Sequence, residues 1–275
     1  MNDSPIGIFD SGIGGLTVVR EVTKLLPGEK IVYFGDTARV PYGSKSPNVV
    51  REFSMQDALF LDGKSVKSIV VACNTASAES IDLLRSEFDI PVIGVIEPGA
   101  RTAAESTKKG IVGVIGTYGT VASGAYTEAV HAVDPSIKVE SVACPLFVPL
   151  VEEGWQDKQV TKKIAEEYLS VLIEKGIDTL ILGCTHYPVL KPVLQEVVGD
   201  GVNLIDSAVA TAAELSRILK ENNLESPADQ KETEHEFFVS DLPYKFKETA
   251  ERFLGKELPD VELVPLELLE SGLKI

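Results

Sequence analysis

The sequence predicts an α/β fold with mainly parallel sheets. The first indication is a set of eight short apolar runs, rich in Val and Ile and without polar alternation, which is typical of strands covered by helices on both faces. They lie at residues 6–9, 31–34, 69–72, 92–96, 111–115, 180–182, 202–205 and 237–239. The second is helical spacing of apolar residues at 77–88, 160–171 and 208–219. Alternating strands and helices predict parallel sheets.

Local repeats indicate that the chain contains two related halves. The segment GVIGT at residues 113–117 resembles GIFDS at 7–11, and the two start 106 positions apart. The cysteines in LGCT and ACNT, Cys184 and Cys73, are separated by a similar 111 positions. Pro98 and Gly99 follow an apolar run and predict a break in regular structure there, near residue 97. The polar, acidic segment 221–236 predicts a surface loop.

Length and charge narrow the range of functions. A chain of 275 residues is long enough for two domains. Its 26 basic and 42 acidic residues give a net charge of −16, which would repel nucleic acid and anionic membrane surfaces. The three cysteines are widely spaced, and the N-terminus has neither a basic nor a long apolar segment. A cytoplasmic protein without a membrane span is therefore expected.

Two of the cysteines stand where a parallel sheet binds its ligands. Cys73 and Cys184 each follow an apolar run directly and precede a small polar residue, and ligands bind at the carboxyl ends of parallel strands. A free thiol is mostly neutral at pH 7 and needs a base or a positive charge beside it to react. His186 is two residues from Cys184, and Asp10 ends the first strand. These two thiols are candidate catalytic groups, whereas Cys144 is interpreted as structural.

The remaining strand ends carry groups suited to a small charged ligand. Gly12, Gly14 and Gly15 follow the first strand but lack the third glycine of a dinucleotide fingerprint, so we expect a small anion there and not NAD. Pro41-Tyr42-Gly43 is interpreted as a turn whose amides could bind an anion, and Asp36 as a loop acid. Side chains with hydroxyl or amide groups, which suit a carboxylate or an ammonium group, are Ser11, Asn74, Thr75, Thr117, Thr120 and Thr185. The sequence lacks the usual spacings of metal ligands, so no metal site is expected.

Six motifs together resemble those of the bacterial glutamate racemases, in the same order and over residues 7 to about 210. They are Asp10-Ser11-Gly12-x-Gly14-Gly15-Leu16-Thr17, Asp36-x-Ala38-Arg39-x-Pro41-Tyr42-Gly43, Cys73-Asn74-Thr75-Ala76, Gly116-Thr117-x-x-Thr120, Pro145-x-x-Val148-Pro149-Leu150-Val151-Glu152 and Gly183-Cys184-Thr185-His186-Tyr187-Pro188.

The resemblance implies a cofactor-independent racemase that interconverts L- and D-glutamate and supplies D-glutamate for peptidoglycan. It also implies two pseudosymmetric, doubly wound α/β domains with the active site in the cleft between them. The first domain would comprise residues 1–97 and 207–275, and the second residues 98–206. Because many members of the family dimerise, a homodimer is expected.

The resemblance also implies a role for each candidate residue. Cys73 would deprotonate D-glutamate and Cys184 L-glutamate, with Asp10 assisting the first thiol, His186 the second, and Glu152 acting as a further acid beside Cys184. The positions that match substrate contacts in the family are Asp10, Ser11, Tyr42, Gly43, Asn74, Thr75, Thr117, Thr120, Thr185 and His186.

Three alternatives remain at this point. The nearest is a two-cysteine racemase for aspartate or a related acid, since the thiols set the reaction and the pocket sets the side-chain length. A hydrolase using Cys184 and His186 is weaker, because it would leave Cys73 without a function. A non-catalytic amino-acid-binding protein could use the same cleft. The Pro-Tyr-Gly and Gly-Cys-Thr-His-Tyr-Pro motifs favour glutamate.

Overall fold

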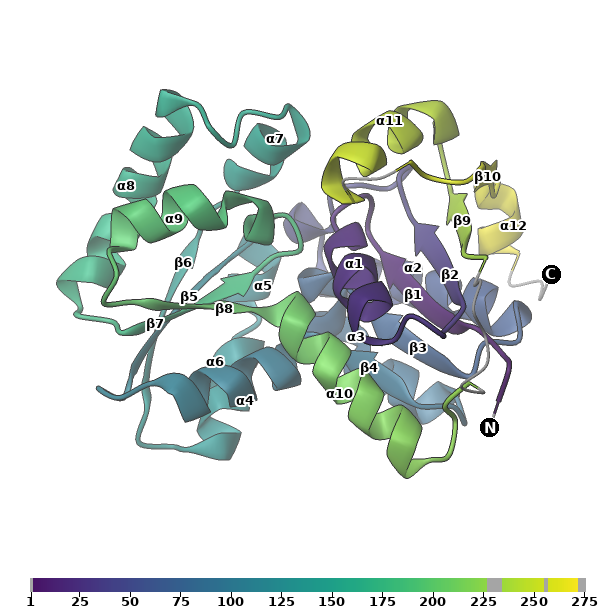
Figure 1. Ribbon diagram of the computed structural model, residues 1–275, viewed down its shortest axis with the longest axis horizontal. Coiled ribbons are helices and arrows are strands. Elements are labelled where there is room, and N and C mark those ends of the chain that lie inside the picture. The colour runs from purple at the N-terminus through teal and green to yellow at the C-terminus, as the bar shows by residue number, and fades with distance from the viewer. Residues whose placement is uncertain (1, 227–233, 255–256, 272–275) are drawn as a thin grey trace.

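The computed structural model describes residues 2–226, 234–254 and 257–271, and its strands form two parallel sheets (Figure 1). In spatial order, the first sheet comprises β10 (Val261–Leu263), β9 (Glu236–Val239), β2 (Ile31–Gly35), β1 (Ile6–Asp10), β3 (Ser68–Val71) and β4 (Val92–Gly94). The second comprises β6 (Lys138–Ala143), β5 (Ile111–Gly116), β7 (Thr179–Gly183) and β8 (Asn203–Asp206). This confirms the predicted α/β class.

The two sheets repeat one strand order. The order β2-β1-β3-β4 of the first sheet matches the order β6-β5-β7-β8 of the second, and every pairing is parallel. The first sheet is extended by β9, which pairs with β2, and by β10. In Figure 1 these C-terminal elements, drawn in yellow-green and yellow, therefore lie beside the N-terminal strands, drawn in purple. Cys73 and Cys184 follow β3 and β7, which hold equivalent places in the two sheets.

Helices cover both faces of the first sheet, as its apolar strands require. Around this sheet lie α1 (Leu16–Leu25), the short η1 (Tyr42–Ser44), α2 (Pro47–Gly63), α3 (Asn74–Glu87), α10 (Ser207–Glu221), α11 (Pro243–Leu254) and α12 (Leu266–Glu270). α1 packs against α10 and α11, while α2 packs against α3 and α12. Neighbouring strand residues belong to different cores: Ile8 lies in the one beneath α1, and Phe9 in the one beneath α2.

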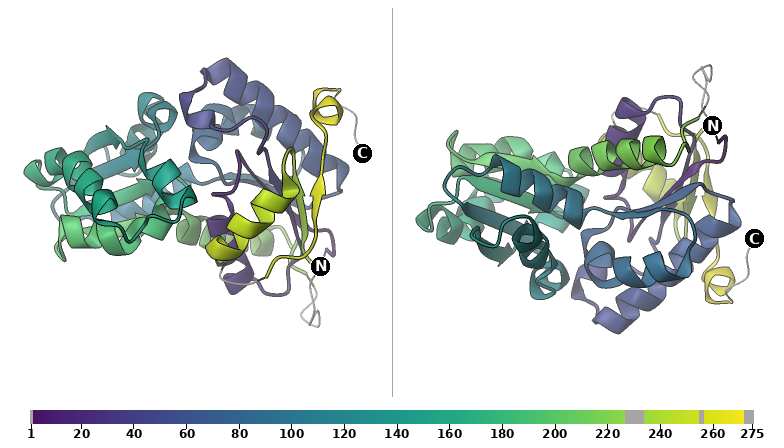
Figure 2. Two further views of the ribbon diagram at one scale, coloured as in Figure 1. Left: turned by 90° about the horizontal axis from the view of Figure 1, so that it is seen from above. Right: turned by 90° about the horizontal axis from the view of Figure 1, so that it is seen from below.

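The second sheet forms a separate lobe beside the first (Figure 2). Its helices are α4 (Ile96–Ser106), α5 (Tyr118–Ala122), α6 (Ala125–Val133), α7 (Phe147–Glu152), α8 (Gln159–Glu174), the short η2 (Tyr187–Leu190) and α9 (Lys191–Val198). α10 follows β8 and packs against both α4 and α1, so it joins the two lobes. Within the ranges that the structure describes, no helix is both long and apolar enough to cross a membrane.

The structure corrects the predicted elements at three places. The apolar run at 92–96 ends as a strand at Gly94, and Pro98 and Gly99 lie in the first turn of α4 and not in a loop. A proline is tolerated there because the first N–H groups of a helix have no partner within it. β6 and β10 were not predicted, because they are partly exposed edge strands with polar residues between the apolar ones. Residues 227–233 of the predicted surface loop lie outside the described residues.

Candidate active site

The carboxyl ends of strands from both sheets meet around one cavity of about 60 Å³. The residues that line it are Ser11, Gly12, Ile13, Val40, Pro41, Tyr42, Gly43, Cys73, Asn74, Thr75, Thr117, Val148, Glu152, Cys184, Thr185 and His186. The structure thus brings nearly all of the predicted site residues together. The two that do not line the cavity, Asp10 and Thr120, are buried and contact residues that do.

Cys73 lies at the start of α3, at the first-lobe side of the cavity, and is 6% exposed. Its Sγ lies 3.5 Å from the Ser11 hydroxyl. Burial, reinforced by the negative charge of Asp10, raises the pKa of the Cys73 thiol to about 12. At neutral pH this cysteine is therefore a thiol, which can give up a proton but does not hold a negative charge.

Cys184 lies on the second-lobe side, beside an imidazole. Its Sγ is 3.9 Å from Nδ1 of His186, and Nε2 of the same ring is 3.0 Å from Oε1 of Glu152. Burial by itself lowers the pKa of His186, but the hydrogen bonds to Cys184 and Glu152 outweigh it and raise that pKa to about 10. The protonated imidazole places a donor and a positive charge beside the sulfur of Cys184. The two cysteines thus meet the cavity in different electrostatic surroundings.

The raised pKa of His186 predicts that the folded protein loses stability as pH rises above neutral. An unfolded histidine loses its proton near pH 6.5, whereas the folded protein keeps this proton up to about pH 10. The stabilisation is complete below pH about 6.5 and falls by at most about 1.4 kcal/mol per pH unit above it. Between pH about 6.5 and 8, Asp57 adds a slope of the same sign, because burial and the charge of Asp36 raise its pKa well above its usual range. The part that belongs to His186 is the difference in slope between the proteins with and without this imidazole.

Urea denaturation at several pH values in that interval measures the slope. His186→Asn should make the slope less steep, because the variant has no group at this position that titrates. His131→Asn is the matched control, since His131 lies on α6 and contacts the backbone oxygen of Ile137, not the cavity. The assignment is wrong if the slope in His186→Asn is as steep as in the unchanged protein.

Asp10 occupies the place where a small anion was expected. Its Oδ2 accepts the backbone N–H of Gly12 at 3.0 Å, and the backbone of Gly15 also bonds to it. The hydroxyl of Thr185 donates to its Oδ1 at 3.4 Å, which links the two lobes. Complete burial raises the pKa of Asp10, and these hydrogen bonds oppose that rise. The anion held by this loop is therefore the protein's own carboxylate.

The glycines of the same loop are explained by packing between the lobes. A Cβ at Gly14 would lie 2.1 Å from Oγ1 of Thr185 and 2.6 Å from Nδ1 of His186. A Cβ at Gly15 would lie 2.5 Å from that of Asp10. Glycine is therefore needed at these positions so that the loop after β1 can pack against Thr185 and His186.

Three threonines form a hydroxyl cluster across the lobe boundary. Thr75 of α3 lies 2.9 Å from Thr117 and 3.1 Å from Thr120, and the last two lie 3.1 Å apart, all between side-chain oxygens. Thr117 also accepts the backbone N–H of Thr120 as the N-terminal cap of α5. Asn74 accepts a hydrogen bond from Tyr126 at 2.7 Å, which holds its amide in place. Hydroxyls can rotate, so this cluster can present donors to a carboxylate.

Tyr42 and Gly43 both line the cavity. Tyr42 is 1% exposed, and its hydroxyl contacts Asp36 and Asp57, which do not line the cavity. A Cβ at Gly43 would lie 2.5 Å from that of Thr117, so the glycine allows the two lobes to approach each other here. Asp36 lies in the loop after β2, as expected, but it is fully buried and hydrogen-bonded, which the sequence did not predict.

The sequence reasoning missed the apolar part of the lining. Ile13, Val40, Pro41 and Val148 contribute walls without hydrogen-bonding side chains. One signal could have located Val148, because it lies four residues before Glu152 on α7 and so shares a helix face with it.

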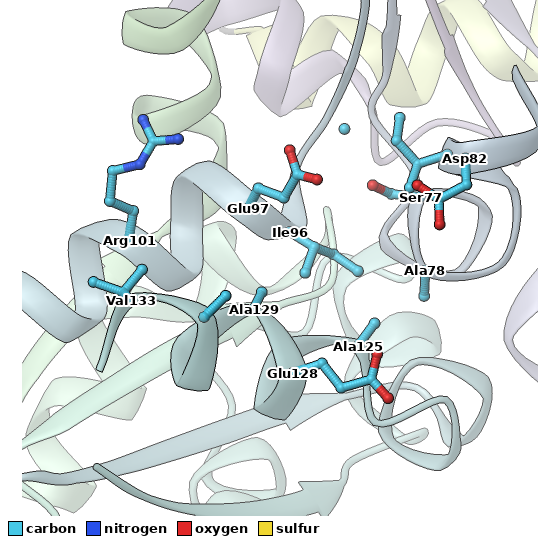
Figure 3. A pocket seen from close by; sticks show the side chains of 13 residues that line it. Ser77, Ala78, Asp82, Ile96, Glu97, Arg101, Ala125, Glu128, Ala129 and Val133 are labelled. Carbon is cyan, nitrogen blue, oxygen red and sulfur yellow. The ribbon is translucent and has the colours of Figure 1, made fainter. Parts of the chain in front are cut away.

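A larger cavity of about 440 Å³ lies between α3, α4 and α6, away from the two catalytic candidates (Figure 3). Asp82, Glu97 and Glu128 bring carboxylates to it, and Arg101 brings a guanidinium. Its lining includes neither a cysteine nor a histidine. The small cavity that holds both thiols is therefore the candidate active site.

The comparisons with known proteins agree with this geometry. The family model described as Asp/Glu/hydantoin racemase matches residues 13–215. A glutamate racemase from Geobacter metallireducens is 53% identical over 262 residues, which cover 95% of this chain and 97% of the relative. One from Chlorobaculum tepidum is 50% identical over 264 residues, which cover 96% and 97%.

Solved structures give the same result. A glutamate racemase isoform from Bacillus anthracis matches with a TM-score of 0.93 and 44% identity, covering 97% of this chain and 99% of that one. The glutamate racemase from Francisella tularensis in complex with D-glutamate matches with a TM-score of 0.90 and 41% identity over the same shares. An aspartate racemase from Picrophilus torridus, at 22% identity and a TM-score of 0.53, shares the fold alone.

Proposed function

The chain belongs to the Asp/Glu/hydantoin racemase family, and we propose that its two thiols interconvert L- and D-glutamate by proton transfer at Cα. The observation that carries this mechanism is that Cys73 and Cys184 line one cavity from opposite lobes, in different electrostatic surroundings. The protein is an isomerase, a glutamate racemase, and its reaction supplies D-glutamate for peptidoglycan.

Racemisation requires a base on one face of Cα and an acid on the other. With L-glutamate bound, the thiolate of Cys184 removes the Cα proton, and the electron pair stays on the carbon and its carboxylate. Cys73 then delivers its own proton to the opposite face, which gives D-glutamate and leaves Cys73 as the thiolate. The reverse reaction exchanges these roles. Both groups that carry a proton to or from Cα in these steps are side chains of the protein.

The carbanion-like transition state needs donors aimed at the developing charge. The hydroxyls of Ser11 and Thr117, together with the backbone of Tyr42 and Gly43, can supply them at the cavity, whereas the hydroxyl proton of Thr185 is donated to Asp10. Such donors act more strongly in a water-excluded site than in water. Both thiols are only 6% exposed, as a water-excluded site requires.

The assisting residues act by different routes. His186 contacts Cys184 directly, and Glu152 holds the imidazole from the other side and stabilises its positive charge. Asp10 affects Cys73 through its charge, because the side chain hydrogen-bonded to this thiol is that of Ser11. We assign Asp10 the role of setting the protonation of Cys73 and of fixing Thr185.

His186→Asn is expected to slow the conversion of L-glutamate more than that of D-glutamate. General acid–base groups contribute about 10²-fold or more, and here the loss falls on the formation of the Cys184 thiolate. The asymmetry should appear in kcat and in the Cα-deuterium isotope effects, since the two kcat/KM values of enantiomers must stay equal. Initial rates in both directions measure it. Unchanged activity is expected for His131→Asn, and equal losses of kcat in both directions for His186→Asn would contradict the assignment.

The function itself is tested by incubating the protein with L-glutamate in D₂O. We expect loss of optical activity together with incorporation of deuterium at Cα, because the proton that arrives comes from a thiol that exchanges with solvent. A binding protein or a cysteine hydrolase would leave both the optical activity and the Cα hydrogen unchanged. D-Glutamate as the starting substrate must give the same final mixture.

The domain division and the assembly are further parts of the proposal. Residues 1–97 with 207–275 would form one domain and residues 98–206 the other, since the chain crosses between the sheets at α4 and α10. A homodimer in the cytoplasm is expected, with glutamate as the small-molecule partner. Sedimentation of the protein with and without glutamate would test the dimer.

A further inference from the structure

A buried polar network lies behind the part of the substrate site formed by Tyr42. The Tyr42 hydroxyl lies 2.5 Å from Oδ2 of Asp36 and 2.9 Å from Oδ2 of Asp57. Arg39 joins the same two acids, with Nε 2.7 Å from Asp36 and Nη2 3.0 Å from Asp57. Both acids are fully buried, and Arg39 is 8% exposed. Asp57 comes from α2, whereas Asp36 and Arg39 lie between β2 and η1, and Tyr42 is the first residue of η1.

The hydrogen atoms in this network can be counted. Asp36 accepts from Arg39, and its second oxygen accepts from Ser240 at 2.8 Å. The one proton of the Tyr42 hydroxyl can serve only one of the two carboxyl oxygens beside it. Donation to Asp36 leaves the 2.9 Å contact with Asp57 without a proton unless the carboxyl of Asp57 carries one. Oδ1 of Asp57 is already engaged by Arg39, so this proton belongs on Oδ2.

The charges lead to the same conclusion. The charged or titratable groups that act on Asp57 are Asp36, Arg39, Tyr42 and, from further away, Asp10. One guanidinium cannot compensate two buried carboxylates, and an uncompensated buried charge is costly. Burial and the charge of Asp36 raise the pKa of Asp57 well above its usual range. A neutral Asp57 leaves a matched pair of Asp36 and Arg39.

The network matters for the site because it joins the segment that carries Tyr42 to α2. The start of this segment is held separately, by hydrogen bonds of Thr37 and Ala38 to the residues after β9. The backbone here is held by turns, with the N–H of Arg39 bonded to the oxygen of Asp36 at 3.2 Å and that of Lys45 to the oxygen of Tyr42 at 3.0 Å. The buried Tyr42 side chain joins this segment to α2 through Asp57. Tyr42 itself lines the cavity, together with Gly43.

We infer that Asp57 is a positioning residue that works as a neutral carboxylic acid, donating its proton to Tyr42 and so holding the Tyr42-Gly43 backbone in place for glutamate. This inference rests on the proposed function, since it assigns this backbone to substrate binding. Asp57 touches neither substrate nor thiol, so its loss should weaken binding and leave proton transfer between the thiols nearly unchanged.

The test compares three variants of the whole protein at neutral pH. Asp57→Asn keeps a donor towards Tyr42 and an acceptor towards Arg39, so KM for glutamate should stay close to that of the unchanged protein. Asp57→Ala leaves Tyr42 and Arg39 with unpaired groups, which should raise KM about tenfold with little change in kcat. Glu52→Gln removes an exposed carboxylate from the same helix and is the matched control.

A second measurement does not depend on activity. Infrared difference spectra should show the C=O stretch of a neutral carboxylic acid that disappears in Asp57→Asn but not in Glu52→Gln. The inference is overturned if this band is absent or if Asp57→Asn raises KM as much as Asp57→Ala does. It is also overturned if Asp57→Ala lowers kcat and leaves KM unchanged. If the band is lost in Asp57→Asn but the protein does not racemise glutamate, the proposed function is refuted while the neutral state of Asp57 stands.

Discussion

Cys73→Ala and Cys184→Ala should each lower the rate of glutamate racemisation by at least about 10³-fold, in both directions. Each substitution removes the only proton carrier that the proposed mechanism places on one face of Cα. The remaining thiol can still reach its own face, but inversion needs both faces. Circular dichroism of L- and D-glutamate solutions follows the loss directly.

Cys144→Ala is the matched control for these variants. Cys144 is also buried and also follows a strand of the second sheet, β6, but it does not line the cavity. Its replacement should leave racemisation close to that of the unchanged protein. If either Cys73→Ala or Cys184→Ala retained full activity, one thiol would serve both faces and the two-base mechanism would be lost.

Aspartate should be a substrate about 10⁴-fold poorer than glutamate in kcat/KM. Tyr42 and Gly43 line the cavity from the first lobe, and Thr117 lines it from the second. If these groups hold the γ-carboxylate, a side chain shorter by one methylene leaves them unpaired in a water-excluded site. Unpaired buried donors are costly, which is why such sites reject shortened analogues strongly.

Parallel assays with aspartate, glutamine and glutamate test this specificity. Glutamine should also fail, because its amide would direct N–H groups at N–H and O–H donors. Comparable kcat/KM for aspartate and glutamate would contradict the specificity while leaving the two-thiol chemistry intact. Loss of activity towards all three would instead count against the racemase function.

The two candidate catalytic thiols could be located from the sequence because the signal for each is local. An apolar strand followed directly by Cys73 or Cys184 places the thiol at the carboxyl end of a parallel sheet, whatever the rest of the fold. The α/β class followed in the same way, since buried central strands such as β1 and β5 are continuous apolar runs. Edge strands such as β6 lack that signature, because one side of the strand faces solvent.

Other features depended on the tertiary structure, because they join residues that are distant in the chain. The contact of Glu152 with His186, the hydroxyl cluster of Thr75 with Thr117, and the packing of Gly14 against Thr185 all cross between separate segments. Sequence patterns specify which face of a strand or helix is buried. They do not specify how the two lobes are oriented, and that orientation decides which side chains meet.

Sequence patterns also do not specify which way a side chain points or whether it carries a proton. From the sequence, Asp36 was a loop acid and Tyr42 a turn residue, whereas the structure turns both side chains into the first lobe beside Asp57 and Arg39. Composition and spacing determined which chemical groups this protein has at the ends of its strands. Only the folded arrangement decided which of them carry a charge, because that depends on burial and on partners contributed by other segments.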